Sequence, residues 1–142
     1  MSLLKVMDIA GSALSAQSLR LNTTAINMAI ADSVSSSIYQ TYRARHPVFA
    51  TMMDDMMMSF EGDSAGTGVT VKGVIESQTP ARSEYQPNNP LADKDGYIHM
   101  PNINMVEEMA NMMSASRSYQ MNIEVANASK NLLQQTLMLG SS

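Results

Sequence analysis

Hydrophobic positions follow a helical pattern at both ends of the chain and a different pattern in its middle. From about residue 104 to 139, mostly apolar residues recur at alternating steps of four and three. The row consists of Met105, Met109, Met112, Ser116, Tyr119, Ile123, Ala126, Lys130, Leu133 and Leu137. Because this spacing returns to one side of an α-helix every seven residues, it predicts a long helix with one apolar stripe.

Residues 3–31 show the same rhythm and predict a second long helix. The positions that recur at intervals of seven are Met7, Leu14, Leu21 and Met28. Ser2 is a suitable N-cap residue, and the polar run that starts at Asp32 is expected to end the helix. Two such stripes favour packing of the helices against each other as an antiparallel coiled coil, or against neighbouring chains. An ordinary buried helix pair within a monomer is the alternative.

The middle, residues 34–103, is expected to be extended and rich in turns. Gly68–Ile75 is β-branched and flanked by glycine, which predicts a strand. Tyr42–Phe49 is compatible with a second strand, which Pro47 restricts to a sheet edge or replaces by irregular structure, and Asp95-Gly96 predicts a turn. Long helices are excluded by Pro80, Pro87, Pro90 and Pro101. The expected fold is therefore α+β, with segments 1–33, 34–103 and 104–142.

Composition excludes several classes of function. The net charge of −4 gives no basic stripe for nucleic acid, and charged residues make up 15% of the chain. Cysteine is absent, which excludes disulfides and thiolate metal sites. No cleaved signal peptide and no membrane-spanning run is expected. We therefore expect no cofactor, and a sparsely charged surface that other protein surfaces cover.

Two local patterns suggest chemistry, and each has a simpler interpretation. Residues 62–66 match the G-x-S-x-G motif of the nucleophile elbow in hydrolases. The sequence lacks the strand–turn–helix context that this motif requires, and its histidines are His46 and His99 alone. A flexible loop is therefore the favoured interpretation. A methionine cluster suggests copper(I) binding, although adaptable packing on a neighbour explains it as well. Its members are Met52, Met53, Met56, Met57 and Met58. We expect neither catalysis nor a metal site.

The end of the first helix resembles the N-terminal signature of bacterial flagellar axial proteins. The matching residues are Asn22, Ala25, Asn27, Ala29, Asp32 and Ser33. Ile30 stands where that family usually has asparagine. The C-terminal half resembles the proximal-rod members of the family through linked stretches, namely Tyr85 to Asp93, Gly96-Tyr97, Pro101-Asn102 and residues 113–125 with Arg117, Tyr119 and Gln120. Residues 50–67 do not resemble the family.

The resemblance implies a structural subunit of the flagellar proximal rod, without enzymatic activity. Such subunits assemble through their terminal helices into a hollow helical drive shaft that transmits torque and lets export substrates pass. Implied partners are further copies, other rod proteins, the basal-body ring and the export apparatus, in the periplasm-spanning rod, after export without a cleaved signal. The expected interface consists of Met7, Leu14, Leu21, Met28, Met105, Met109, Met112, Tyr119, Ile123, Ala126, Leu133 and Leu137.

Several alternatives stay open from the residues themselves. A self-contained helical adaptor would use the same stripes, and a copper-binding protein would use the methionine cluster. Asn27, Asn102 and Asn122 either fix the register of a coil or form local hydrogen bonds, the latter favoured for Asn102. Because isolated terminal helices would bury little apolar surface, they are expected to be partly disordered alone and to fold on assembly.

Overall fold

The computed structural model describes residues 2–52 and 68–140. Within these residues, two helices bracket four strands. The elements are α1 (Leu3–Ile30), β1 (Arg45–Met52), β2 (Gly68–Glu76), β3 (Arg82–Tyr85), β4 (Tyr97–Met100) and α2 (Met105–Gly140). The predicted α+β class is confirmed, while residues 62–66 and all of the methionine cluster except Met52 lie outside the described residues.

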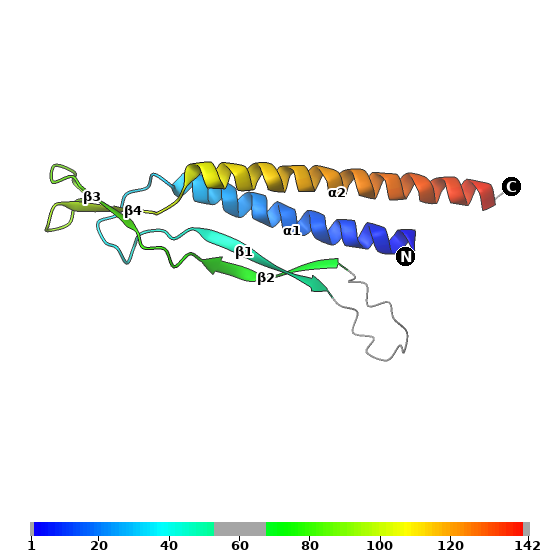
Figure 1. Ribbon diagram of the computed structural model, residues 1–142, viewed down its shortest axis with the longest axis horizontal. Helices are drawn as coiled ribbons and strands as arrows, with labels where there is room; N and C mark the ends of the chain where they lie inside the picture. The colour runs from blue at the N-terminus through cyan, green and yellow to red at the C-terminus, as the bar shows by residue number, and fades with distance from the viewer. Residues whose placement is uncertain (1, 53–67, 141–142) are drawn as a thin grey trace, which may run out of the picture.

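The two helices lie side by side and run in opposite directions along the long axis of the molecule (Figure 1). The Ser2 hydroxyl caps α1 by accepting a hydrogen bond from the Lys5 amide at 3.4 Å. Asn104 caps α2, because its Oδ1 accepts from the Val106 amide at 3.1 Å. With 36 residues against 28, α2 extends past the N-terminal end of α1 (Figure 1). Supercoiling of the pair stays a prediction.

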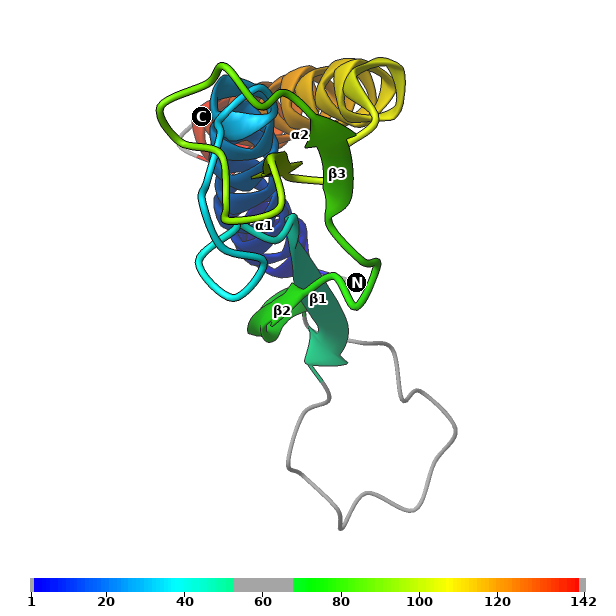
Figure 2. The same cartoon turned by 90° about the vertical axis from the view of Figure 1, so that its left-hand side faces the viewer.

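A two-stranded antiparallel ribbon of β1 and β2 packs along α1 (Figures 1 and 2). The paired residues run from Arg45 opposite Glu76 to Met52 opposite Gly68, with an irregularity after Val48. Both predicted strands are therefore confirmed, β1 shifted a few residues toward the C-terminus. Pro47 is tolerated because each strand of a two-stranded ribbon keeps one unpaired edge for its missing N–H.

The other strand pair, β3 and β4, forms the end of the molecule beyond the helices, which we call the tip (Figure 1). The sequence did not predict β3, whose four residues are all exposed and so lack the apolar alternation of a half-buried strand. The predicted turn is confirmed, since the Gly96 amide donates to the Asp93 carbonyl at 3.1 Å. Gly96 has a φ of 82°, a conformation that favours glycine.

The interior of the molecule is small and partly polar. Its fully buried larger side chains are those of Ile98 and Asn27. Alanines supply most of the buried apolar positions, which lets backbones approach closely. Most large apolar side chains retain substantial exposure. Among the described residues, no helix combines the length and apolar character needed to cross a membrane.

Candidate assembly site

The inward face of α2 is more polar than a buried helix face usually is. Among the described elements α2 packs against α1 alone, so its buried residues define the side that faces α1. These residues are Glu108, Ala115 and Ser129, spaced by multiples of seven. Ala115 is completely buried, and two of the three positions carry polar groups. The α1–α2 contact therefore relies on close approach and hydrogen bonds.

Large apolar side chains of α2 point to solvent instead. Val106, Met109, Met113 and Met121 are exposed by 75, 52, 57 and 64%. At 3.6 residues per turn they fall within about a third of the helix circumference, opposite the inward face, and we call them the outer face of α2. A surface helix of a monomer normally places its apolar side inward. In α2 apolar and polar side chains are instead spread around the helix, and the exposed large apolar ones mark the outer face as a surface for a partner.

The predicted interface residues divide between these two environments. Half-buried positions are Met7, Leu14, Leu21 and Met28 of α1, and Met112, Tyr119, Ala126 and Leu133 of α2. Exposed positions are Met105, Met109, Ile123 and Leu137. One heptad series of α2 thus lies beside the inward face, and the other points away from α1. Their role in contacts between subunits stays a prediction.

The family-motif residues also separate by environment. Asn27 is fully buried, and Tyr119 is half-buried. The exposed members are Asn22, Ala25, Ala29, Asp32, Ser33, Asn102, Arg117 and Gln120. Asn27 is therefore the motif residue for which the single chain itself provides a structural explanation.

Asn27 joins the two helices to the start of β1. Its Nδ2 donates to the Arg45 carbonyl at 2.9 Å and to Glu108 Oε2 at 3.2 Å. Its Oδ1 accepts from the Tyr42 hydroxyl at 2.9 Å and from the Arg45 amide at 3.0 Å. An asparagine amide has two donor hydrogens and two acceptor lone pairs, so all four are used. A buried and fully bonded side chain fixes the relative positions of its partners.

The surroundings of this asparagine shift one ionisable group. Burial raises the pKa of the Tyr42 phenol above its ordinary value, and the Glu108 and Glu76 carboxylates raise it further against the opposing effect of Arg45. Tyr42 is therefore held in the neutral form that donates to Asn27. The sequence pointed to Asn27 but not to Tyr42 or Glu108. Glu108 fits equally well as an acidic residue in the first turn of a helix, so its sequence position gave no sign of burial.

Two further contacts fix α1 against its neighbours. Arg20 Nη2 donates to Asn111 Oδ1 on α2 at 3.1 Å. At the other end of the ribbon, the Ser12 hydroxyl accepts from the Val69 amide at 3.0 Å and donates to the Ile9 carbonyl at 2.8 Å. A Cβ at Gly68 would lie 2.6 Å from Ser12 Oγ, so glycine permits this close approach. The ribbon is thus anchored to α1 at both ends.

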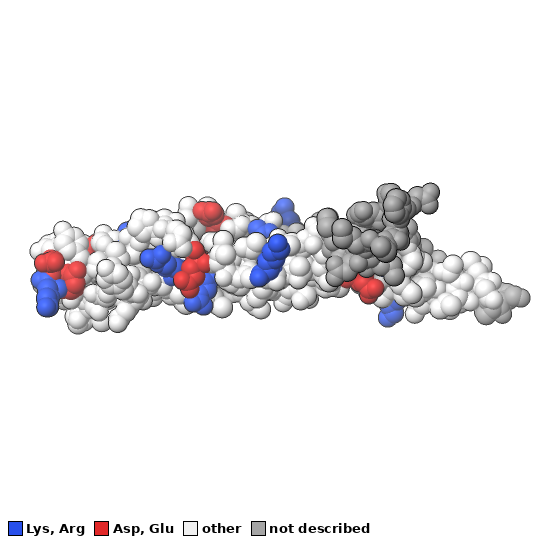
Figure 3. All heavy atoms as spheres, turned by 90° about the horizontal axis from the view of Figure 1, so that it is seen from below, with Lys and Arg blue, Asp and Glu red and all other residues white. Residues whose placement is uncertain are grey.

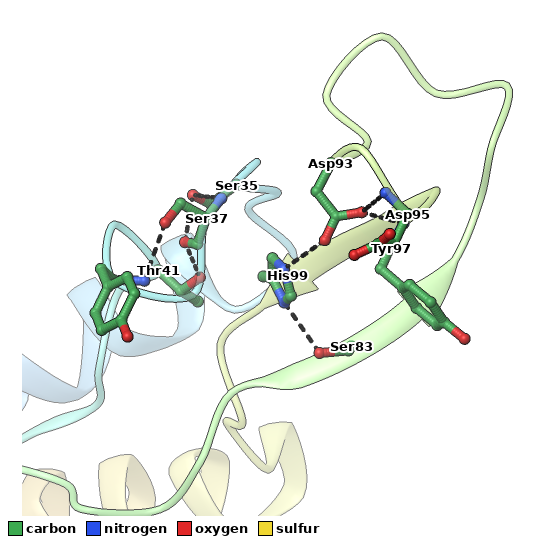
Figure 4. A network of polar contacts seen from close by, with 9 residues as sticks. Ser35, Ser37, Thr41, Ser83, Asp93, Asp95, Tyr97 and His99 are labelled. Atoms are coloured by element: carbon green, nitrogen blue, oxygen red, sulfur yellow. Dashed lines mark hydrogen bonds and ion pairs between the residues drawn. The ribbon is translucent and has the colours of Figure 1, made fainter.

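His99 holds the tip together (Figure 4). Its Nδ1 lies 2.9 Å from the Ser83 hydroxyl on β3, and its Nε2 lies 3.3 Å from Asp93 Oδ2. Its backbone amide and carbonyl pair with Ser35 at 2.9 and 2.8 Å, which ties the tip to the segment after α1. Three segments distant in sequence therefore meet at one residue.

Asp93 is the most strongly bonded acid of the tip. Its Oδ1 accepts from the Tyr97 amide at 2.8 Å and from the Asp95 amide at 2.9 Å. The Tyr97 hydrogen bond above all, with those from Asp95 and His99, lowers the pKa of Asp93 below its usual value. The carboxylate is therefore ionised while it closes the turn between β3 and β4.

The Ser83–His99–Asp93 set resembles a hydrolase triad in composition but not in arrangement. In a serine hydrolase the acid contacts Nδ1 of the histidine and the serine contacts Nε2. Here the two nitrogens are exchanged, and Ser83 is exposed on a strand rather than placed at a strand-to-helix turn. The set acts as a structural link. Among the described residues, no group of three or more His, Cys, Asp or Glu side chains is placed to hold a metal ion.

Comparison with known proteins identifies the class to which this architecture belongs. Residues 94–139 match the family described as "Flagellar basal body rod FlgEFG protein C-terminal". The chain is 53% identical over 140 residues to the flagellar basal-body rod protein FlgC of Salmonella typhimurium, and 52% identical over the same length to that of Escherichia coli O6:H1, covering 99% of each chain. FlgC of Buchnera aphidicola (subsp. Schizaphis graminum) is 40% identical over 142 residues, again covering 99% of each chain.

The class is that of the structural proteins of the flagellar basal-body rod. Within it, the chain belongs to the FlgC family.

Proposed function

We propose that the protein builds the proximal part of the flagellar rod by packing the outer face of α2 against neighbouring subunits. The large apolar side chains that α2 exposes carry this proposal, because burial of exposed apolar surface drives association. Contacts between different faces of successive copies are heterologous, and a rotation that does not close generates a helical tube. Such a tube is a hollow shaft that transmits torque and lets export substrates pass.

The distribution of charge supports the same proposal. No charged residue follows Lys130, and the C-terminal end of α2 shows neither blue nor red on the face seen in Figure 3. Buried charges are costly unless paired, so a helix meant for burial on several sides benefits from few of them. Leu137, a residue of the predicted interface, is 67% exposed on this uncharged end.

Transmission of torque requires that the middle segment turn with the helices. The Asn27 hydrogen bonds connect both helices to β1, and the His99 backbone pairing connects the tip to the segment after α1. We therefore propose that the middle segment, including the tip, moves as one body with the helical tube. Other rod proteins, the basal-body ring and the export apparatus are the proposed partners.

A pair of variants tests the role of the outer face. Val106→Lys with Met113→Lys places two cations among the exposed apolar side chains of α2, whereas Gln78→Lys with Asn88→Lys adds the same charge at exposed polar positions of the middle segment. In cells that lack their own copy of this protein, the first variant should be missing from isolated basal bodies and should not restore motility. The second should assemble. Normal assembly of the first variant would overturn the proposal.

Folding on assembly is a separate part of the proposal. Hydrogen exchange on purified dilute protein should be fast throughout residues 3–31 and 104–139, and slower in the middle segment. Strong protection of both helices in a proven monomer would contradict folding on assembly and would favour a self-contained adaptor. The copper-binding alternative rests on the methionine cluster, of which all but Met52 lie outside the described part, and copper(I) titration against a variant with leucine at the five clustered methionines tests it.

A further inference from the structure

Three of the residues on the outer face of α2 are methionines, and their sulfur atoms give this surface a chemistry beyond packing. Met109, Met113 and Met121 are each more than half exposed. The chain has 15 methionines and no cysteine, so thioethers are its oxidisable sulfur groups.

We propose that Met109, Met113 and Met121 form an oxidation-sensitive site, at which peroxide-type oxidants convert the thioethers to sulfoxides and thereby prevent subunit association. This inference rests on the proposed function, because it concerns the same face.

The reaction is balanced with hydrogen peroxide as the oxidant. The sulfur lone pair attacks one peroxide oxygen, an S–O bond forms as the O–O bond breaks, and the other oxygen leaves as water. Sulfur is oxidised and peroxide is reduced. A dithiol-dependent methionine sulfoxide reductase reverses the change, returning the thioether and water while the dithiol becomes a disulfide.

The buried groups between α2 and α1 are not expected to react. The buried residues of α2 are Glu108, Ala115 and Ser129, and none of them is a methionine. The cross-helix hydrogen bonds are made by asparagine, arginine and glutamate side chains. Oxidation of the outer face therefore leaves the groups that hold α2 to α1 unchanged.

Association is expected to be lost for a different reason. A sulfoxide oxygen is a strong hydrogen-bond acceptor, and burying it without a donor is unfavourable. Three such oxygens on one apolar surface should weaken association about tenfold or more. Subunits already assembled should react slowly at these positions, because their sulfur atoms are covered.

The test compares three forms of the full-length purified protein before and after mild peroxide treatment. They are the natural sequence, a variant with Met109→Leu, Met113→Leu and Met121→Leu, and a control variant with Met7→Leu, Met28→Leu and Met112→Leu. The control replaces the same number of methionines at half-buried positions. Mass spectrometry locates the sulfoxides, circular dichroism follows helicity, and sedimentation velocity measures association over a concentration series.

The inference predicts that peroxide weakens association of the natural protein and of the control variant by about tenfold or more, and that the outer-face variant still associates as before treatment. Reductase treatment should restore the first two. Two results would overturn the inference while leaving the proposed function intact. One is that peroxide weakens association of the outer-face variant as much as that of the natural protein. The other is full association of natural protein that carries sulfoxides at these three positions. Failure of the untreated natural protein to associate at any concentration would overturn self-association in the proposed function and this inference with it.

Discussion

Asn27 of α1 donates a hydrogen bond from Nδ2 to Glu108 Oε2 of α2 across 3.2 Å, and both side chains are buried. Residues near opposite ends of the chain are thereby joined at the point where the middle segment begins. Since the same asparagine also holds the backbone of Arg45, one side chain sets the positions of both helices and the ribbon. Several consequences are measurable.

Replacement of Asn27 should strongly reduce the stability of the protein, measured at concentrations at which the subunits associate and both helices are folded. Asn27→Ala leaves the Glu108 carboxylate, the Tyr42 hydroxyl and the Arg45 backbone without their partner, which should cost on the order of 3 kcal/mol in the free energy of unfolding. Asn22→Ala is the matched control, because Asn22 is exposed on the same helix. It should change the free energy by less than about 0.5 kcal/mol. Equal effects in denaturant titrations would refute the central role of Asn27.

Alkaline pH should destabilise the protein through Tyr42. The phenol has a higher pKa in the folded protein than its ordinary value of 10.0, so the folded state holds this proton more tightly than the unfolded state. The resulting stability is fully present below pH 10.0 and is lost as pH rises through the folded pKa. Denaturant titrations over this range should show a smaller pH dependence for Tyr42→Phe. An unchanged alkaline dependence in that variant would show that other groups cause it.

Acidic pH should loosen the tip through Asp93. Its pKa is lower in the folded protein than the ordinary 3.8, so its contribution is present above pH 3.8 and is lost as pH falls through the folded pKa. The amides of Asp95 and Tyr97 bond to this carboxylate, and their NMR chemical shifts should change together in that range. Asp93→Asn should remove the transition. If the chemical shifts of the two amides changed at different pH values, they would not report one shared carboxylate.

Substitution of Gly96 should lower the free energy of unfolding. A Cβ there would lie 2.9 Å from the Tyr85 ring, and the φ of 82° would cost a non-glycine residue about 1–2 kcal/mol by itself. Gly96→Ala should therefore lower the free energy of unfolding and disturb the edge-on Tyr85–Tyr97 contact, which NMR detects between the rings. Gly73→Ala is the control, since nothing lies within 4 Å of the Cβ it adds. A tip that accepts both changes equally would contradict the described turn.

The long helices and the ribbon strands were predictable because each follows from local patterns. Heptad spacing marks α1 and α2, and β-branched residues between glycines mark β2. Strand β3 was not predictable, because its residues are exposed and show no apolar alternation. It pairs with β4 across a loop, and the hydrogen bonds of that loop leave no periodic pattern in the sequence. Its neighbour β4 was missed as well, because four residues are too few for an alternation to stand out.

The site was predictable in type but not in orientation. Heptads indicate that α2 packs on something, yet they do not say which of its sides meets α1. The side that meets α1 turned out to carry Glu108, which accepts a hydrogen bond from Asn27, and Asn111, which accepts one from Arg20. Complementarity between residues about 80 positions apart is a tertiary property, and one sequence does not display it.

Site-specific labelling tests the central claim most directly, because the natural chain has no cysteine. A single cysteine at Met113, on the outer face of α2, is compared with one at Gln78, an exposed position after the ribbon. Each is treated with a maleimide reagent as purified subunit and in isolated basal bodies. If the outer face is buried between subunits, the Met113→Cys protein is labelled when free and protected in basal bodies, while Gln78→Cys reports how well the reagent reaches the assembled rod. Equal labelling of Met113→Cys in free subunits and in intact rods would contradict assembly through this face.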